Sequence, residues 1–139
     1  MSTSKNKAVI RNVIENVFNK GNISSITEHI APEYVYHSPF GEFKGPEGFK
    51  QFVLMTRGAF PDIQMKIDDM VGEGDTLAVR LTWNGTFKGK FGSFEPTGKK
   101  VSMTAAYFYR FKDGKEIEAL AYTDTLSFFQ QLGIKPPTH

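Results

Sequence analysis

The fold is decided by one stretch near the end of the chain, Glu116-Ile-Glu-Ala-Leu-Ala-Tyr-Thr-Asp124, which runs into Leu126-Ser-Phe-Phe-Gln-Gln-Leu-Gly133. This pattern predicts the last strand of a sheet followed by a short final helix. Strand alternation predicts that Leu120, Tyr122 and Asp124 share one face. A carboxylate on an apolar face indicates a helix cap, a salt-bridge partner or a catalytic acid or base.

Upstream of this stretch, the first part of the chain has helical periodicity. Apolar residues recur at intervals of three and four within residues 5–20, 23–30 and 46–60, which predicts three amphipathic helices. Residues 33–37 are rich in β-forming side chains and predict a short strand. Residues 41–45 predict a turn or a short return strand.

After residue 62 the apolar period changes to two. Alternation predicts strands over residues 63–70, 76–87 and 100–111, with tight turns between them and before the final strand. Helices followed by hairpin-linked strands favour the α+β class, in which helices pack on one face of a curved antiparallel sheet. The sequence shows no internal repeat or linker, so we expect one domain over residues 1–139.

Composition limits the classes of partner. The 139 residues carry a formal net charge of only +2 without a long run of one sign, so we expect no nucleic acid partner. The sequence has no cysteine, and its three histidines lack the spacing of a metal site, so we expect no metal. No segment approaches the roughly 20 apolar residues of a membrane span. We therefore expect a soluble, cytoplasmic protein without a membrane partner.

Short motifs spread through most of the chain occur in an order that is typical of one family. These motifs are Tyr34-Val-Tyr-His37, Gly45-Pro-Glu-Gly-Phe49, Phe60-Pro-Asp62, Gly74-Asp75, Gly85-Thr86, Pro96-Thr-Gly-Lys99, Tyr109-Arg110, Asp113-Gly-Lys115, Asp124 and Gln131-Leu-Gly133. With them the chain resembles the SnoaL-like polyketide cyclases, or ester cyclases, of the nuclear transport factor 2-like superfamily. Their order and distances are specific for the family rather than for one reaction.

The resemblance implies a fold and a chemistry. The implied fold is a cone-shaped α+β barrel with an internal cavity, and the implied assembly is a homodimer formed through the outer face of the sheet. Characterised members close an aldol ring in anthracycline biosynthesis without metal or cofactor. In them an aspartate at the place of Asp124 serves as acid and base. By analogy, Asp124 takes a proton from an activated carbon and returns one to the developing alkoxide.

Two positions depart from the family pattern. Phe87 stands where the family usually has histidine, and Leu120 stands where it often has tryptophan. The resemblance places both at the substrate pocket. The first change then removes a polar group from the pocket, and the second changes the shape of the pocket beside Asp124.

Several other residues are candidates for the substrate site. His37 is either a polar helper that donates to a substrate carbonyl or a half-buried side chain bonded to backbone. Three tyrosines flank the last predicted hairpin, namely Tyr107, Tyr109 and Tyr122. Each hydroxyl either polarises a substrate carbonyl or belongs to a packed ring whose hydroxyl reaches solvent. Phe52, on the third predicted helix, lines the pocket or fills the core.

Asp124 has two structural alternatives to a catalytic role. Aspartate is a favoured N-cap residue, and the final helix begins at about this position. Asp124 is also a potential ion-pair partner of Arg80 or Arg110. The family resemblance favours the catalytic role over both.

These observations predict a cofactor-free enzyme of the lyase or isomerase type. Its expected chemistry is proton transfer on an apolar, carbonyl-bearing small molecule, because a dry pocket with one carboxylate suits that reaction. The alternative is a non-catalytic or regulatory module that binds a small hydrophobic ligand, which the changes at Phe87 and Leu120 favour. Hydrolysis of an epoxide usually requires more than one positioned carboxylate and an arginine, which the sequence does not assemble.

Overall fold

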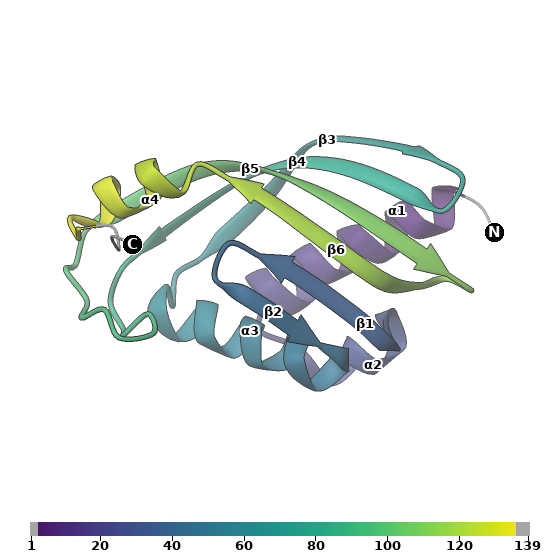
Figure 1. Ribbon diagram of the computed structural model, residues 1–139, viewed down its shortest axis with the longest axis horizontal. Coiled ribbons are helices and arrows are strands. Elements are labelled where there is room, and N and C mark those ends of the chain that lie inside the picture. The colour runs from purple at the N-terminus through teal and green to yellow at the C-terminus, as the bar shows by residue number, and fades with distance from the viewer. Residues whose placement is uncertain (1–2, 136–139) are drawn as a thin grey trace.

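The computed structural model describes residues 3–135. Its elements in chain order are α1 (Thr3–Asn12), η1 (Val13–Asn19), η2 (Ile23–Ser25), α2 (Ile26–His29), β1 (Ile30–Ser38), β2 (Gly41–Lys44), α3 (Gly45–Ala59), β3 (Gln64–Glu73), β4 (Thr76–Thr86), β5 (Lys100–Lys112), β6 (Lys115–Thr123) and α4 (Thr125–Leu132). Figure 1 shows the long strands as one curved layer, with α1 and α3 on one side and α4 at the end where β6 leaves the sheet.

The six strands form one open sheet in the order β2-β1-β6-β5-β4-β3. Neighbouring strands are antiparallel except β1 and β6, which are parallel. The predicted α+β fold with a curved sheet around N-terminal helices is confirmed, and the prediction of an entirely antiparallel sheet is wrong at this one pair. Tight turns fix the relative direction only of strands that follow one another in the sequence. β1 and β6 are separated by four other strands and α3, so no turn signal sets their direction.

The π-helical segment η1 is fastened to its neighbours by side chains that bond main-chain groups. The Asn19 amide donates to the carbonyl of Met65 at 2.9 Å and accepts from the N–H of Met65 at 2.7 Å. Arg57 of α3 donates to the carbonyls of Phe18 and Asn19. Carbonyls at the end of a helix lack partners within it, so the guanidinium caps η1. These bonds hold η1 against both β3 and α3.

The core consists of two apolar clusters. The first packs η1 and α3 on the inner face of the sheet and is centred on the fully buried Val17 and Val53. The second lies where α3 and β4 end, β5 begins and α4 packs, and it includes Phe60. Each fully buried side chain of this size contributes about 1.5–3 kcal/mol. Met65 and Trp83 pack against both clusters, so they mark the place where the two clusters meet.

A bulge near the start of β6 changes which side chains face the helices. Phe111 pairs with Glu116 and Arg110 pairs with Glu118, so Ile117 is an extra residue in β6. Without the bulge Glu116 and Glu118 would lie on the same face of the strand. The extra residue turns Glu116 into the interior, whereas Glu118 remains only half-buried.

Beyond the bulge, the inward face of β6 is the one opposite to the prediction. Ala119, Ala121 and Thr123 turn toward the helices, and Leu120 and Tyr122 face outward. The alternation was predicted correctly, but the choice of face was wrong. Apolar residues occupy both faces of β6, so hydrophobicity alone does not identify the inner one. Small alanines lie inside because rings from β1 and β5 fill the space in front of them.

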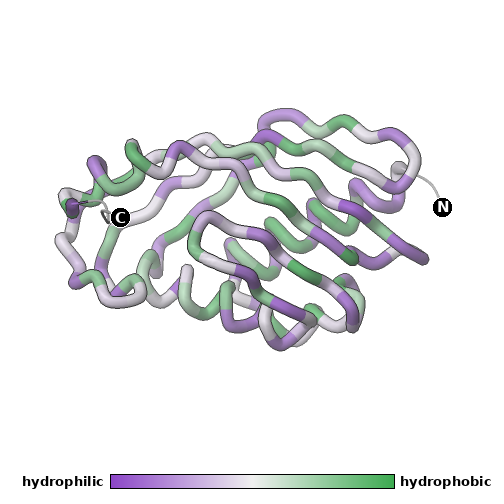
Figure 2. The backbone as a smooth tube through the Cα atoms, viewed as in Figure 1, coloured by the Kyte–Doolittle hydropathy of each residue, from purple (hydrophilic) through white to green (hydrophobic). Residues whose placement is uncertain are grey.

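Within residues 3–135, no helix is long and apolar enough to cross a membrane. Figure 2 shows that hydrophilic residues interrupt the hydrophobic ones along α1 and α3. This pattern is that of helices with one buried face.

Candidate functional site

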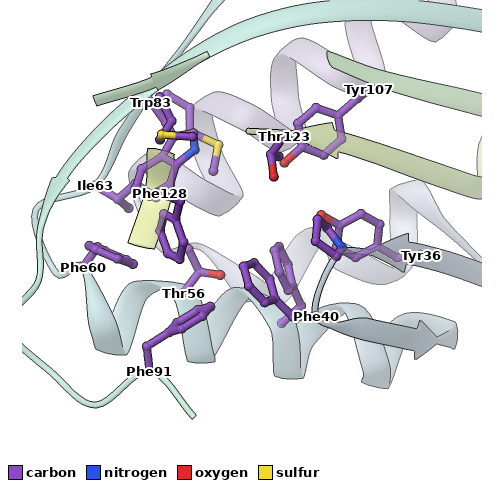
Figure 3. Close-up of a pocket in the computed structure, with 14 residues that line it drawn as sticks. Tyr36, Phe40, Thr56, Phe60, Ile63, Trp83, Phe91, Tyr107, Thr123 and Phe128 are labelled. Carbon is purple, nitrogen blue, oxygen red and sulfur yellow. The ribbon is translucent and has the colours of Figure 1, made fainter. Parts of the chain in front are cut away.

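An apolar cavity of about 60 Å³ lies between α3, the β1–β2 turn and α4. The C-terminal end of β4 and the N-terminal end of β5 also border it. We call it the outer cavity. Its walls are formed by Tyr36, Pro39, Phe40, Phe52, Thr56, Phe60, Ile63, Met65, Trp83, Phe91, Met103, Tyr107, Thr123 and Phe128. Figure 3 shows the rings of Phe60, Phe91 and Phe128 around the same space into which the hydroxyls of Tyr107 and Thr123 point.

The outer cavity offers hydroxyl groups but no charged side chain. Its polar groups are the hydroxyls of Tyr36, Tyr107, Thr56 and Thr123 and the indole N–H of Trp83. Within the described residues, no carboxylate, imidazole, amine or guanidinium lines it. Residues 3–135 also contain no group of three or more potential metal ligands from His, Asp and Glu. The cavity therefore suits an apolar ring with an oxygen that accepts a hydrogen bond.

The size of the outer cavity means that its mouth must widen for a ring to enter. A cavity of about 150 Å³ is known to hold benzene, and the outer cavity is less than half that size. Phe40 at the β1–β2 turn is 41% exposed, and its ring centre lies 5.0 Å from that of Phe91 and 5.7 Å from that of Phe128. As the exposed member of this ring cluster, Phe40 is the side chain whose displacement most simply opens the cavity.

A second cavity of about 20 Å³ lies deeper, among η1, β1, α3, β5 and β6. We call it the inner cavity. Tyr36, Phe52, Met65 and Tyr107 line both cavities, so these four side chains separate them. A water molecule needs about 10–15 Å³ measured in this way, so the inner cavity has room for about one water molecule.

The wall of the inner cavity carries a buried acid, Glu116. Glu116 is 1% exposed, and neither of its carboxyl oxygens has a hydrogen-bond partner within residues 3–135. Burial penalises the charged form and raises the pKa of Glu116 from 4.5 to about 8. The carboxyl is therefore mainly protonated at pH 7. Buried polar groups almost always have a partner, so an unpartnered acid beside a cavity is a candidate functional group.

Four tyrosines connect Glu116 to the outer cavity. Burial raises the pKa of Tyr34, Tyr36, Tyr107 and Tyr109, and the nearby Glu116 raises those of Tyr34 and Tyr109 further. The hydroxyls of Tyr36 and Tyr107 interact closely enough to shift each other's pKa, raising that of Tyr36 and lowering that of Tyr107. The rings of Tyr107 and Tyr109 are stacked with their centres 5.8 Å apart, and those of Tyr36 and Tyr107 with centres 6.4 Å apart. A row of hydroxyl-bearing rings thus extends from the buried acid to the outer cavity.

Asp124 caps the final helix and lines neither the outer nor the inner cavity. Its carboxylate accepts from the N–H of Ser127 at 3.0 Å, its carbonyl accepts from the N–H of Phe128 at 3.0 Å, and the residue is exposed. The preceding residue, Thr123, is the one that reaches the outer cavity. The predicted position of Asp124 beside an apolar cavity is therefore wrong. The cap geometry turns its carboxylate back onto the first turn of α4.

The two arginines considered as partners of Asp124 pair with other carboxylates. Arg80 donates to Asp69 at 2.8 Å, and Nε of Arg110 lies 3.2 Å from the carboxylate of Glu118. The N-cap alternative for Asp124 is therefore confirmed, and the ion-pair alternative is wrong.

His37 lies on the outer side of the sheet in a row of charged groups. Its ring nitrogens lie 2.9 Å from a carboxylate oxygen of Glu42 and 3.2 Å from one of Glu118, which also pairs with Arg110. His37 lines neither cavity. Its predicted position beside the substrate is wrong because β1 alternates, and the neighbouring Tyr36 takes the inward position. The backbone-bonded alternative is wrong too, since both partners in the described residues are side chains.

The other candidates from the final strands and α3 divide between inside and outside. Phe52 and Tyr107 line both cavities, and Tyr109 lines the inner one. The structure therefore places these three side chains at the cavities, and their contact with a substrate stays a prediction. Leu120 and Tyr122 lie on the outer face of the sheet, and Tyr122 is 57% exposed. Their predicted positions at the pocket are wrong, because the inward face of β6 is the opposite one.

Phe87 fills the core and lines neither cavity. It is 0% exposed, and its ring centre lies 5.7 Å from that of Phe60, which does line the outer cavity. The predicted pocket position of Phe87 is therefore wrong. The departure from the family's histidine changes packing behind the wall of this cavity and removes no polar group from its lining.

Three polar residues of the inner cavity were not predicted from the sequence: Glu116, Tyr34 and Tyr36. Alternation in the short strand at 33–37 places Tyr34 and Tyr36 on one face and His37 on the other, so this signal was present. No comparable signal marks Glu116. A bulge adds one residue without a sequence pattern of its own, and only the pairing of β5 with β6 reveals it.

The curved sheet, the helices on its inner face and the aromatic cavity between them define a protein of the nuclear transport factor 2-like type. A model of the family of SnoaL-like polyketide cyclases matches residues 8–132, which is most of the chain. The chain belongs to this family.

Several solved structures are similar over nearly their whole length. A protein provisionally named a polyketide cyclase, from Acidithiobacillus ferrooxidans, is 32% identical with a TM-score of 0.79, over 96% of this chain and 98% of that one. IdmH from Streptomyces antibioticus is 29% identical with a TM-score of 0.78, over 93% and 99%. AclR from Streptomyces galilaeus, provisionally named a hydroxylase, is 28% identical with a TM-score of 0.81, over 99% and 91%. No curated protein matches the chain.

Proposed function

We propose that the protein is a cyclase-type enzyme that performs acid–base chemistry on an apolar, carbonyl-bearing small molecule bound in the outer cavity. The observation that carries this proposal is the combination of aromatic walls with the neighbouring, interacting hydroxyls of Tyr36 and Tyr107. Membership of the SnoaL-like polyketide cyclase family supports the reaction class. One similar structure is named a hydroxylase, so the family alone does not fix the reaction.

The geometry supports a division of labour within the outer cavity. The walls exclude water from the ligand's rings, which strengthens every electrostatic interaction inside. The tyrosine hydroxyls then donate to the carbonyl oxygen of the ligand, where negative charge develops as the α-carbon loses its proton. For the base we propose Asp124, which follows the cavity-lining Thr123. To act, its carboxylate exchanges its bond to the N–H of Ser127 for a position at the mouth of the cavity.

The variant Asp124→Asn tests the base without losing the helix cap. Asparagine caps helices about as well as aspartate. We therefore expect the free energy of unfolding to stay within about 0.5 kcal/mol, whereas Asp124→Ala lowers it by about 1 kcal/mol. The exchange of α-hydrogens of 2-tetralone for deuterium, followed by NMR in D₂O, should slow by about 100-fold or more in Asp124→Asn, the usual contribution of a general base. An unchanged exchange rate would leave Asp124 as a helix cap only.

A non-catalytic ligand-binding module is the second candidate. Two observations favour it: no carboxylate lines the outer cavity in the described residues, and Asp124 is engaged as a cap. The same experiment separates the two candidates. An enzyme accelerates deuterium exchange in 2-tetralone above the rate in buffer, whereas a binding module binds 2-tetralone and leaves its exchange rate at that of buffer.

We also propose that the outer face of the sheet pairs with a second copy of the chain. Phe108 is 43% exposed there, beside Tyr122 at a ring-centre distance of 6.0 Å and opposite Leu120 in the β5–β6 register. Exposed apolar side chains grouped in this way mark interaction surfaces.

We expect Phe108→Lys to weaken self-association by about 100-fold, as for a central interface residue. Val71→Lys, at an even more exposed apolar position on the edge strand β3, is the control. Sedimentation equilibrium checks this, and a wild-type protein that stays monomeric at 100 µM contradicts it.

A further inference from the structure

We propose that Glu116 is a proton donor that serves the outer cavity through one water molecule in the inner cavity and the hydroxyl pair of Tyr36 and Tyr107. This inference rests on the proposed function, because it supplies the acid that complements the base in the same reaction. It gives a role to a buried carboxyl that no other part of the mechanism uses.

The carboxyl of Glu116 lies at the wall of the inner cavity. Both oxygens of Glu116 are buried at the wall of the inner cavity without a hydrogen-bond partner in residues 3–135. The cavity has room for about one water molecule. Water is stable in a small cavity only if polar groups bind it, and the carboxyl of Glu116 and the surrounding tyrosines offer such groups. A carboxyl that serves only packing would have been replaced at little cost by an apolar residue of the same size.

Within the described residues, Glu116 has no charged partner at this cavity. The elements packed around Glu116 contribute four titratable groups, namely Tyr34 and Tyr36 from β1 and Tyr107 and Tyr109 from β5. In the described residues, η1, α3, β3 and β4 present only apolar side chains to this cavity. No cation among residues 3–135 lines this cavity, and burial is the cause of the raised pKa. The acid thus retains its proton near neutral pH and faces the tyrosines of the inner cavity.

The inner cavity is continuous with the outer cavity through shared wall residues. Tyr36 and Tyr107 line both cavities, and their hydroxyls interact closely enough to shift each other's pKa. Glu116 does not line the outer cavity, so a ligand there meets these hydroxyls and not Glu116 itself. Glu116 is therefore a residue that acts through others, and a proton reaches the ligand along hydroxyl groups.

The proton transfer balances as follows. As the ligand's α-carbon loses a proton to the base, its carbonyl oxygen takes a proton from a tyrosine hydroxyl. The tyrosine oxygen takes a proton from the water, and the water takes the proton of Glu116. One C–H bond and one Glu116 O–H bond have broken, and one O–H bond has formed on the ligand and one on the base. Nothing is oxidised or reduced. When the enol returns to the ketone, the proton on its oxygen follows the same path back to Glu116.

The test observes Glu116 directly by NMR of protein labelled with ¹³C at the glutamate side-chain carboxyls. Its signal is identified by its loss in Glu116→Gln. We expect 2-tetralone at saturation to move the midpoint of the Glu116 titration by at least about half a pH unit, since one pH unit reflects a tenfold change in proton affinity. Tetralin, which has the same rings without the carbonyl, should leave the midpoint unchanged. Equal midpoints with both ligands at their solubility limits overturn the inference.

A kinetic readout separates this inference from the proposed function. We expect Glu116→Gln to slow deuterium exchange in 2-tetralone at least tenfold and to flatten its dependence on pH between 6 and 9. Glu118→Gln, two residues along on the outer side of the same strand, is the matched control and should show neither effect. Exchange by the wild type together with an unaffected Glu116→Gln variant overturns the inference and leaves the proposed function standing. A ketone-dependent shift of the Glu116 signal without exchange by the wild type supports the proton linkage and overturns the proposed function.

Discussion

Glu116→Gln is expected to remove most of the pH dependence of stability between pH 5 and pH 9. In the wild type the pKa of Glu116 is 4.5 in the unfolded chain and about 8 in the folded protein. Between these values the folded state binds a proton that the unfolded state has released, so the free energy of unfolding falls as the pH rises. The slope approaches about 1.4 kcal/mol per pH unit, and the loss between pH 5 and pH 9 is about 4 kcal/mol.

The other groups with shifted pKa values do not lower stability between pH 5 and pH 9. The pKa of Asp62 is lowered by hydrogen bonds from Thr86, so its contribution is present above about pH 4 and is lost only below that. The raised pKa values of the buried tyrosines act only above pH 10. Among the groups with shifted pKa values in the described chain, only Glu116 makes the free energy of unfolding fall between pH 5 and pH 9.

Urea denaturation at each pH measures the effect. We expect the wild-type curve to fall across this range and the Glu116→Gln curve to be nearly flat, with the variant the more stable protein at pH 9. Glu118→Gln keeps the wild-type slope and serves as the control. Parallel curves for the wild type and Glu116→Gln would show that the Glu116 carboxyl reaches solvent.

Phe128→Ala is expected to have the second large effect, because this ring is the hub of the outer cavity. Its ring centre lies between 5.5 and 6.2 Å from those of Phe129, Phe91, Trp83 and Phe60. Removing a buried phenylalanine from a packed site typically costs about 3–5 kcal/mol. The deletion also enlarges the outer cavity, so an apolar ring such as benzene should bind there and restore part of the lost stability.

The matched control for this effect is the neighbouring phenylalanine. Phe129 is equally buried in the same cluster but does not line the outer cavity. We expect Phe129→Ala to lose a similar free energy of unfolding without a gain from benzene. The measurement is the melting temperature of each variant with and without saturating benzene. A benzene effect of equal size in both variants would contradict the assignment of Phe128 to the wall of the cavity.

Periodicity predicted most of the fold because it reports which side of an element is buried. The third predicted helix, at 46–60, matches α3 at Gly45–Ala59, since its apolar stripe packs on the inner face of the sheet. The last hairpin was predicted from Asp113-Gly114, where both residues adopt positive φ as a tight turn requires. Such signals are local, so a single sequence reveals them.

The site was harder to predict because it depends on pairing between distant strands. Ile117 is the extra residue that turns Glu116 inward, and only the register of β5 against β6 determines this. Asp124 shows the reverse case. Its cap role was a local inference and is confirmed, whereas its predicted place at the cavity depended on knowing which face of β6 lies inside. Sequence alone therefore predicted an acid shielded from water, and the acid that the structure shields is Glu116.

The central claim is that the outer cavity binds an apolar ketone, and methionine methyl NMR tests this most directly. Met65 and Met103 line the outer cavity, whereas Met70 packs elsewhere against the first apolar cluster. With ¹³C-methyl methionine, addition of 2-tetralone should shift the signals of Met65 and Met103 in a saturable way and leave that of Met70 in place. Unchanged Met65 and Met103 signals at the solubility limit of 2-tetralone would contradict the claim.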